Sequence, residues 1–384
     1  NTLKIGLKKK LTISNNFSLI NNCDMIFVSV GTPQKSNGAI ELSMIKKATT
    51  TIGQIIRKSK KNPTVFIKST VVPGTTQDVI LPILEKTSGK KANIDFGLIS
   101  NPEFLQESNA IRDTKYPHVI ILGGKQTKYM KKAKMFFSKM HPNVPIVITN
   151  FQTAEMIKYA NNSFLATKIS FINQLSNICQ NIPGTNIDDI AKIIGLDSRI
   201  GKLFLNAGPG YGGACLPKDV SALIKFSDKI GVKPILLSAV EKTNREQMNN
   251  IVSLMKKILG SITSKRITIL GTAFKPNTDD VRDSKSIELI KKLLKNKAKI
   301  TIHDPKAIEN TKKIFGKKIL YAKSISDALN KSQCVIIMTH WKQYDTLNNN
   351  SIKQMNRKII IDCRRVLVKK ELDAKYYAIG IGKS

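Results

Sequence analysis

The stretch Met25-Ile26-Phe27-Val28-Ser29-Val30 is the first of several short apolar runs that are separated by segments with helical spacing. Such runs are typical of buried strands, and segments such as Leu42 to Lys58 and Gln77 to Lys86 have the apolar period of amphipathic helices. The other strands expected in the first third of the chain are Thr64 to Ile67, Phe96 to Ile99, Val119 to Leu122 and Ile146 to Thr149. This alternation predicts an α/β sheet.

The rest of the chain changes to a helical pattern and then returns to the α/β alternation. Helical spacing runs from Thr153 to about Asn181 and again from about Ile230 to Leu259, which at about 1.5 Å per residue is long enough to connect two domains. Further strands are expected at Ile267 to Leu270, Lys299 to His303, Cys334 to Thr339 and Ile359 to Asp362. We predict two Rossmann-like α/β domains, 1–150 and 261–384, joined by a helical central domain, 151–260, with a long connecting helix.

The beginning of the chain lacks the pattern that usually opens a nucleotide-binding domain. Such a domain begins with a strand, a glycine-rich turn and a helix, whereas this chain begins with Asn1-Thr2-Leu3, a lysine-rich run and no initiator methionine. We therefore expect that the first βαβ unit of the N-terminal domain, roughly 30 residues or more, is missing. Either the chain is a fragment or the gene has lost the unit.

Length and composition restrict the class of protein. A chain of 384 residues with 41% apolar residues is long enough for two or three globular domains. No apolar run approaches the roughly 20 residues of a membrane span, and no signal peptide is recognisable, so we expect a cytoplasmic protein without membrane association. The five cysteines are scattered and never in CxxC spacing, which predicts neither disulfides nor a metal site.

A formal net charge of +36 suits binding to a polyanion such as a nucleic acid. The lysines, however, occur in twos and threes along segments with the pattern of solvated helix faces, and no block of five or more is interleaved with aromatic residues. The sequence therefore predicts no nucleic-acid partner. The charge favours small anionic substrates such as nucleotides.

The most informative loop is Gly208-Pro209-Gly210-Tyr211-Gly212-Gly213-Ala214-Cys215-Leu216-Pro217-Lys218-Asp219. A thiol attacks as the thiolate, so Lys218 is expected to lower the pKa of Cys215 while the glycines leave the sulfur approachable. Asp219 supplies a carboxylate that can hold or deprotonate a water. The alternative is a small buried cysteine in a turn. The glycines also match the dinucleotide-binding spacing, but no clear strand precedes them, Pro209 lies inside the motif and Pro217 follows it, so we expect a substrate loop.

Lys158 and Asn162 are four residues apart in a predicted helix, so they lie on one face. A cation and an amide donor directed at one point can stabilise an oxyanion. The alternative is an ordinary solvated polar face.

Three further loops follow predicted strands. Asn101 to Glu107 contains Glu103, a candidate base, and Ser69 to Thr76 contains hydroxyls that can bind a water or a cofactor amide. Phe274 to Ser284 combines cations with helix N-cap residues, which suits a phosphate. Each loop, taken alone, is also compatible with an ordinary turn.

Taken together, these segments resemble the UDP-glucose/GDP-mannose dehydrogenase family over essentially the whole chain. The motifs that carry the resemblance, in the order found in the family, are Val30-Gly31-Thr32-Pro33, Ser69 to Thr76, Asn101 to Glu107, Ala154 to Asn162 with Phe171-Ile172-Asn173, Gly208 to Asp219, Phe274 to Ser284 and Ile361-Asp362-Cys363-Arg364.

The resemblance implies an NAD-dependent, four-electron oxidation of the C6 alcohol of a nucleotide sugar to a carboxylate. It implies that Cys215 attacks the aldehyde stage to form a thiohemiacetal, and that a second hydride transfer leaves a thioester, which water hydrolyses. Lys158 and Asn162 match the positions that stabilise the oxyanion. The residues that match positions organising or activating water are Asp219, Thr70 and Glu103.

The resemblance also implies contacts with substrate and cofactor. The expected substrate-binding residues are Glu107, Phe104, Leu105, Tyr211, Gly212, Phe274, Lys275 and Arg364. The expected cofactor-binding residues are Thr32, Pro33, Thr70, Lys218 and Arg282. Arg364 is expected to reach the substrate from the C-terminal domain, within its own chain or across a dimer. A homodimer is expected through the long central helix, because its apolar stripe needs a partner.

A few positions depart from the usual pattern of the family, and none removes a proposed catalytic group. They are Ala214 for serine, Leu216 for phenylalanine, Gln174 for glutamate and Cys363 for glycine. The segments Leu205 to Gly208 and Lys275 to Arg282 look like those of UDP-glucose enzymes, so UDP-glucose is the expected substrate. UDP-N-acetylmannosamine, UDP-N-acetylglucosamine and GDP-mannose are alternatives, as is a shortened, noncatalytic nucleotide-sugar-binding protein. Without its opening unit the chain is expected to bind NAD poorly.

Overall fold

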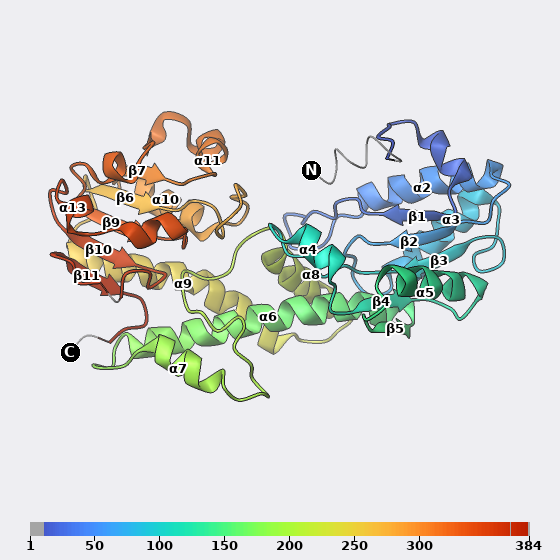
Figure 1. The fold of residues 1–384 in the computed structure, drawn as a ribbon, viewed down its shortest axis with the longest axis horizontal. Helices are drawn as coiled ribbons and strands as arrows, with labels where there is room; N and C mark the ends of the chain where they lie inside the picture. Colours follow the sequence, from blue (N-terminus) through green and yellow to red (C-terminus); the bar gives the residue numbers. More distant parts are fainter. Residues whose placement is uncertain (1–10, 369, 383–384) are drawn as a thin grey trace. The chain divides into compact units, whose positions relative to one another are not determined.

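The computed structural model describes residues 11–368 and 370–382. The chain divides into two compact units, one ending at Ala160 and the other beginning at Asn161. We call them the first and the second unit, and Figure 1 shows the elements of each. The expectation about the opening ten residues lies outside the described part of the chain.

The first unit contains a five-stranded sheet with the order β1-β2-β3-β4-β5. Its strands are β1 (Met25–Val28), β2 (Thr64–Ile67), β3 (Gly97–Ser100), β4 (Ile120–Gly123) and β5 (Ile146–Thr149). Neighbouring strands are parallel, except β3 and β4, which pair antiparallel. Its helices are η1 (Phe17–Asn22), α2 (Ser43–Lys58), η2 (Thr76–Ile80), α3 (Leu81–Ser88), α4 (Ala110–Lys115) and α5 (Lys128–Met140), and α6 (Phe151–Cys179) begins here and continues into the second unit.

Helices cover both faces of this sheet, because its central strands are apolar on both sides. On β2, Val65 and Ile67 belong to a core formed with α2 and α3, whereas Phe66 belongs to a second core formed with α5. A mostly parallel sheet between two layers of helices is the arrangement of a doubly wound domain. The prediction of an α/β N-terminal domain is confirmed.

The second unit combines a helical part with another sheet. The helical part contains the remainder of α6 and then α7 (Ile187–Ile194), α8 (Leu216–Lys229) and α9 (Ile235–Leu259). The strands of the sheet are β6 (Arg266–Leu270), β7 (Lys299–His303), β8 (Leu320–Tyr321), β9 (Cys334–Ile337), β10 (Ile359–Asp362) and β11 (Lys375–Ala378). Its other helices are α10 (Lys285–Lys295), α11 (Ile308–Phe315), η3 (Gly316–Lys318), α12 (Ile325–Leu329), η4 (Lys342–Thr346) and α13 (Asn349–Ile352).

The order of this sheet is β8-β7-β6-β9-β10-β11, and all its neighbouring strands are parallel. Numbered from β6, this is the 3-2-1-4-5-6 order of dinucleotide-binding sheets. The order reverses between β6 and β9, and ligands of such sheets bind outside the carboxyl ends of the strands near that point. The fold therefore favours a ligand near the segments that follow β6, β9 and β10.

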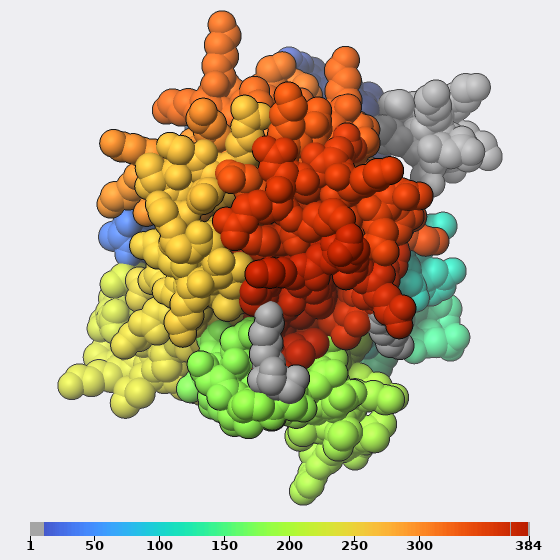
Figure 2. Space-filling model, turned by 90° about the vertical axis from the view of Figure 1, so that its left-hand side faces the viewer, coloured from blue at the N-terminus to red at the C-terminus, as the bar shows by residue number. Residues whose placement is uncertain are grey.

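The end of the chain packs against the helical part of the second unit. The Gly380 amide donates to Oε1 of Gln180 at 2.9 Å, and the Ile187 amide donates to the Gly380 carbonyl at 3.0 Å. Figure 2 shows this red C-terminal segment above the green surface of α6 and α7. Gly380 has a φ of +78°, and a Cβ there would lie 2.4 Å from Ile187, so the contact requires glycine.

The main strands and helices agree with the sequence predictions, and the differences have simple causes. The sequence did not predict β8 or β11, because short edge strands carry little apolar pattern. A helix, α8, does follow the glycine-rich loop, and Pro217 lies in its first turn, where the missing amide hydrogen is not needed. No strand precedes the loop, so the rejection of a dinucleotide motif stands. Among the described helices, none combines the length and the apolar composition that a membrane span requires.

Candidate functional site

The first unit brings together charged groups that follow β2 and β3. Oε1 of Glu103 lies 3.2 Å from Nζ of Lys158 on α6. Lys158 is 4% exposed, so a solvated polar face is the wrong description of this residue. A buried ammonium beside one carboxylate keeps a fixed position, which suits it to stabilise a negatively charged oxygen.

Lys68, directly after β2, adds a second ammonium to this cluster. Burial lowers its pKa to about 8; Glu103 opposes this shift, and Lys158 adds to it. The Phe104 ring lies beside the same cluster, with its centroid 5.4 Å from Nζ of Lys158. The Leu105 amide donates to Oε2 of Glu103 and so fixes the carboxylate against its own loop. Sequence reasoning missed Lys68, although its place at a strand end was a usable signal.

The segments after β1 and β2 are linked by hydroxyl groups. Thr32 Oγ1 donates to the Thr70 carbonyl at 2.8 Å, and Ser69 Oγ donates to the Val30 carbonyl at 2.7 Å. Thr32 is buried, whereas Pro33 is exposed and Thr70 is partly exposed. The two expected cofactor segments are therefore adjacent at the carboxyl edge of parallel strands, where a dinucleotide binds in sheets of this kind.

Glu155, one turn before Lys158 on α6, anchors the loop that contains Thr70. Its carboxylate accepts hydrogen bonds from the Gly74 amide at 2.7 Å and the Thr76 amide at 2.8 Å, so it caps the start of η2. Burial raises the pKa of Glu155 to about 7, against the lowering effect of these hydrogen bonds. Sequence reasoning missed Glu155, because an acidic residue in an amphipathic helical pattern is expected on the exposed face, whereas Glu155 is buried.

In the second unit, Cys215 is exposed and stands directly before α8. The start of a helix favours negative charge, so this position favours the thiolate that attacks a carbonyl. The alternative of a buried cysteine is wrong for Cys215, whereas Cys179 and Cys334 are buried. Sequence reasoning assigned activation of the thiol to Lys218, but the structure pairs Nζ of Lys218 with Oδ1 of Asp219 at 2.5 Å.

Asp219 is 1% exposed and is held by a second donor as well. Nδ2 of Asn162, on α6, donates to its Oδ2 at 2.6 Å. Sequence reasoning gave Asn162 and Asp219 different roles, and the structure places them in direct contact. Two donors fix the carboxylate in one orientation, close in sequence to the thiol, which suits it to hold a water.

The backbone of the glycine-rich loop is held by buried side chains. The Gly208 amide donates to Oδ1 of Asn173 at 2.7 Å, and Gln247 donates to the Gly208 carbonyl at 2.9 Å. Asn244 bonds both the amide and the carbonyl of Tyr211, at 2.8 and 3.1 Å. Sequence reasoning missed the roles of these side chains, although a pair of polar residues three apart on the apolar face of α9 was a usable signal.

The glycines of the loop permit close packing by the segment that follows β6. A Cβ at Gly213 would lie 2.5 Å from the Phe274 ring, and one at Gly212 would lie 2.3 Å from the Asp283 carbonyl oxygen. The Gly213 amide donates to the Arg282 carbonyl at 3.0 Å. The glycines therefore serve this packing, in addition to any role in exposing the thiol.

A cavity of about 370 Å³ opens beside the start of this loop. It is lined by Ile169, Asn173, Leu203, Phe204, Asn206, Gly208, Gly210, Lys275 and Arg364. Lys275 follows β6 and Arg364 follows β10, so the cavity lies at the carboxyl edge of the sheet. Burial lowers the pKa of Arg364 to about 10, and its Nε donates to the Met338 carbonyl at 2.8 Å. Two cations in one cavity suit a diphosphate.

Other expected site residues have different surroundings. Tyr211 is 4% exposed, and burial raises the pKa of its hydroxyl. Arg282 forms a two-pronged pair with Asp280, with Nη2 at 2.6 Å. Their roles with substrate and cofactor, and those of Gly212 and Glu107, stay predictions. Within residues 11–368 and 370–382, no group of three or more His, Cys, Asp or Glu side chains could hold a metal ion.

Comparisons with known proteins match the chain in three parts to one family. The NAD binding domain of the UDP-glucose/GDP-mannose dehydrogenase family matches residues 2–141, its central domain matches 152–246 and its UDP binding domain matches 268–369.

Individual relatives are similar over nearly the whole chain. The chain is 39% identical to UDP-glucose 6-dehydrogenase AglM of Haloferax volcanii, over 94% of this chain and 84% of that protein. It is 36% identical to UDP-glucose 6-dehydrogenase TuaD of Bacillus subtilis, over 97% of this chain and 80% of that protein. The solved structure of a UDP-glucose dehydrogenase from Pyrobaculum islandicum superimposes with a TM-score of 0.90 at 32% identity, covering 99% of this chain and 85% of that one.

Proposed function

The chain belongs to the UDP-glucose/GDP-mannose dehydrogenase family, and we propose that it oxidises UDP-glucose to UDP-glucuronate. The observation that carries the proposal is the exposed Cys215 at the start of α8, four residues before a buried carboxylate held by Asn162 and Lys218. A nucleophile has to add to the aldehyde carbon before a second hydride can leave, and an accessible thiol is suited to this addition.

As a member of this family, the protein is an NAD-dependent dehydrogenase. The residues of the first unit fit the cofactor, because Thr32, Pro33 and Thr70 are joined at the carboxyl edge of parallel strands. When bound, NAD accepts the hydride from C6 of the sugar. The protein has to hold the cofactor, orient the sugar and move the protons.

In the first step, the C6 hydroxyl becomes an aldehyde. The hydroxyl proton passes to a water held by Asp219, and bound NAD would accept the hydride from C6. Lys158 and Asn162, one turn apart on α6, stabilise the negative charge that develops on the oxygen. Glu103 keeps Lys158 in place, since the two form an ion pair.

In the second step, the aldehyde becomes a carboxylate through Cys215. The sulfur adds to C6, and the thiol proton ends on the aldehyde oxygen, giving a thiohemiacetal. In the thiohemiacetal, the hydroxyl proton again passes to the water held by Asp219, and a second NAD would accept the hydride from C6, which leaves a thioester. Water, activated by Asp219 and organised by Glu103 and Thr70, adds to the thioester, and the C–S bond breaks to release the carboxylate and regenerate the thiol.

The cavity of the second unit supports a nucleotide diphosphate as the recognised part of the substrate. Lys275 and Arg364 supply two positive charges, and the family's UDP binding domain matches the segment that contains both. The relatives named above are UDP-glucose enzymes, which favours UDP-glucose over the N-acetylated UDP sugars and GDP-mannose. The sugar itself and the 1–150, 151–260 and 261–384 division remain part of the proposal.

We also propose a homodimer, and the structure suggests which helix forms it. Apolar residues in the middle and at the end of α9, such as Met248 and Met255, are buried inside the second unit, whereas Ile235 and Leu236 in its first turn are exposed. Helix α6 instead exposes Phe164, Phe171 and Ile178, which are seven residues apart and lie along one face. Large apolar side chains that recur along one helix face indicate a partner, and a second copy supplies a matching face.

The first experiment measures NADH formation by absorbance with UDP-glucose and NAD. We expect two NADH per UDP-glucose in the wild type, and Cys215→Ser to stop carboxylate production. Cys23→Ser is the matched control, because Cys23 is also a free cysteine and is not among the proposed site residues. Carboxylate production by the Cys215→Ser variant at the wild-type rate is incompatible with the proposed mechanism. A wild-type protein that binds UDP sugars but forms no NADH with any of them supports the noncatalytic alternative.

A further inference from the structure

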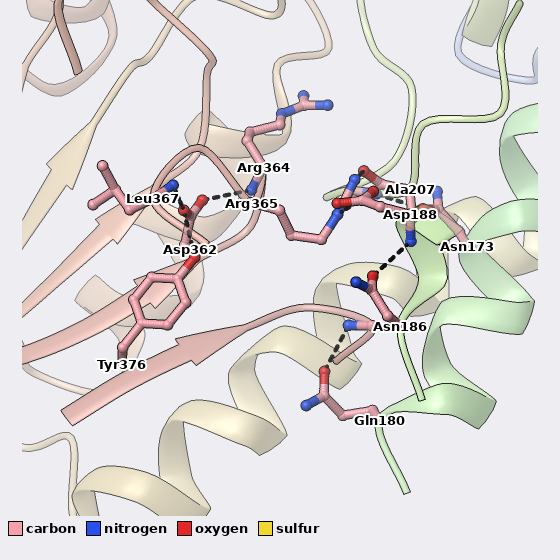
Figure 3. Close-up of polar contacts among 12 residues, drawn as sticks. Asn173, Gln180, Asn186, Asp188, Ala207, Asp362, Arg364, Arg365, Leu367 and Tyr376 are labelled. Carbon is pink, nitrogen blue, oxygen red and sulfur yellow. Dashed lines mark hydrogen bonds and ion pairs between the residues drawn. The ribbon is translucent and has the colours of Figure 1, made fainter. Parts of the chain in front are cut away.

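Arg365 follows the cavity residue Arg364, but its side chain extends to a different part of the second unit (Figure 3). Its Nε donates to Oδ1 of Asp188 on α7 at 2.7 Å, and its Nη2 donates to the Ala207 carbonyl at 2.8 Å. The side chain is 4% exposed. One guanidinium therefore connects the sheet of the second unit with α7 and with the start of the glycine-rich loop.

Hydrogen bonds to a buried carboxylate fix the backbone of the turn that carries Arg365. The Asp362 carboxylate, 0% exposed, accepts hydrogen bonds from the Arg364 amide, the Leu367 amide and the Tyr376 hydroxyl at 2.8 to 2.9 Å. Arg365 has a φ of +56°, which is a strained backbone conformation for an arginine. Strain at a non-glycine residue that the surroundings enforce is found most often at functional sites.

The burial of Arg365 excludes an ordinary surface ion pair. Its third nitrogen, Nη1, is buried and has no hydrogen-bond partner among the described residues. A buried guanidinium with one unsatisfied nitrogen is costly in desolvation, so Arg365 depends on the two contacts that it does make.

We propose that Arg365 is a positioning residue for the nucleotide-sugar cavity, because it fixes the start of the glycine-rich loop relative to the turn that carries Arg364. Ala207 directly precedes Gly208 and Arg365 directly follows Arg364, and both Gly208 and Arg364 line the cavity. Gly208 has little freedom, since a Cβ there would lie 2.8 Å from Nη1 of Arg364. A small change in the Arg365 to Ala207 contact therefore changes the space available to the substrate.

The geometry requires arginine and not merely a positive charge. The planar fork of the guanidinium reaches Asp188 and the Ala207 carbonyl at the same time, whereas a lysine ammonium reaches only one of them well. Asp188 lies on α7 with its side chain 44% exposed, and its carboxylate orients the guanidinium of Arg365. Loss of Asp188 should therefore have a smaller effect than loss of the guanidinium, because the bond to the Ala207 carbonyl remains.

The inference rests on the proposed function, so the test has one readout that needs a ligand and one that does not. The variants are Arg365→Lys and Asp188→Asn. The matched controls are Arg199→Lys and Asp197→Asn, which alter an exposed Arg–Asp pair just after α7. The measurements are the affinity for UDP by calorimetry, KM and kcat with UDP-glucose, the melting temperature, and hydrogen exchange of the 207–213 peptide.

For Arg365→Lys we expect about tenfold or more weaker UDP binding, a matching rise in KM, and faster exchange of the 207–213 peptide, with kcat changed by less than about threefold. Asp188→Asn should show the same pattern more weakly, and the controls should behave as wild type. Unchanged UDP affinity and KM in Arg365→Lys, even with a lowered melting temperature, means that the residue is only structural and overturns the inference. Unchanged loop exchange overturns it as well. A wild-type protein that binds no UDP while the loop exchange still responds to Arg365→Lys overturns the proposed function and, with it, the role in substrate binding.

Discussion

Asn162 and Asp219 are the two residues whose contact most changes the interpretation of the site. The sequence indicates an oxyanion donor on one helix and a water-binding carboxylate in a distant loop, with no reason to connect them. In the structure, the amide donates to the carboxylate at 2.6 Å, and Lys218 occupies the other oxygen. A donor that orients the carboxylate and, in the proposed mechanism, also stabilises the oxyanion couples the two roles.

Replacing Asn162 with alanine should therefore impair the chemistry more than substrate binding. We expect kcat for carboxylate production to fall by about 100-fold, because one oxyanion donor is lost and a buried carboxylate keeps only one partner. Asn181→Ala, which removes an exposed amide just after α6, is the control and should leave kcat unchanged. Steady-state kinetics with saturating NAD and UDP-glucose give the comparison. A kcat within twofold of the wild type would show that Asn162 only packs.

At the scale of elements, Glu155 of α6 caps η2, and its titration predicts that the free energy of unfolding depends on pH. Burial raises the pKa of Glu155 from 4.5 to about 7, and Asp78 adds to the rise. Between these two values the folded state keeps the proton that the unfolded state releases, so folding is progressively disfavoured as the pH rises from about 4.5 to 7. Above about pH 7 Glu155 is ionised in both the folded and the unfolded state. The free energy of unfolding then stays lower by a constant amount of roughly 3 kcal/mol.

Glu155→Gln removes this titration. The difference in the free energy of unfolding between variant and wild type should therefore rise with pH from 5 to 7 and level off above pH 7. Urea unfolding followed by circular dichroism at several pH values measures it. Glu85→Gln, which removes a partly exposed carboxylate of the same unit, controls for the loss of one negative charge. A difference that is flat between pH 5 and 7 would mean that the Gly74 and Thr76 amides already keep Glu155 ionised.

The sequence predicted those elements whose pattern is local. Thr64 to Ile67 and Lys299 to His303 were predicted to the residue, because short runs rich in β-branched and apolar residues with polar flanks are typical of buried strands. Cys215 and Lys158 were found from residue chemistry and spacing, and the resemblance added Arg364. Arg365 was not found, because its partner Asp188 is 177 residues away and nothing in the local pattern marks the pair.

At the scale of the whole molecule, the apolar stripe of α6 predicts how two copies associate. Phe164 is 64% exposed, and Phe171 and Ile178 are each 51% exposed, and the stripe is about 21 Å long at about 1.5 Å per residue. Side chains of this size rarely remain in water along one contiguous face of a helix. Phe171, at the centre, contributes the part of the interface that is furthest from solvent once two stripes meet.

Phe171→Glu should therefore convert a dimer to a monomer, because it places a charge at the centre of an apolar interface. Light scattering at micromolar concentration measures the mass of the wild type and of the variant. Met135→Glu, which introduces the same charge at an exposed apolar residue of α5, should leave the mass unchanged. A wild-type protein that is already a monomer contradicts the proposed association, and a Phe171→Glu variant that remains dimeric moves the interface away from α6. Since α6 also carries Asn162, loss of the dimer together with a reduced kcat would mean that the partner stabilises the helix on which the reaction depends.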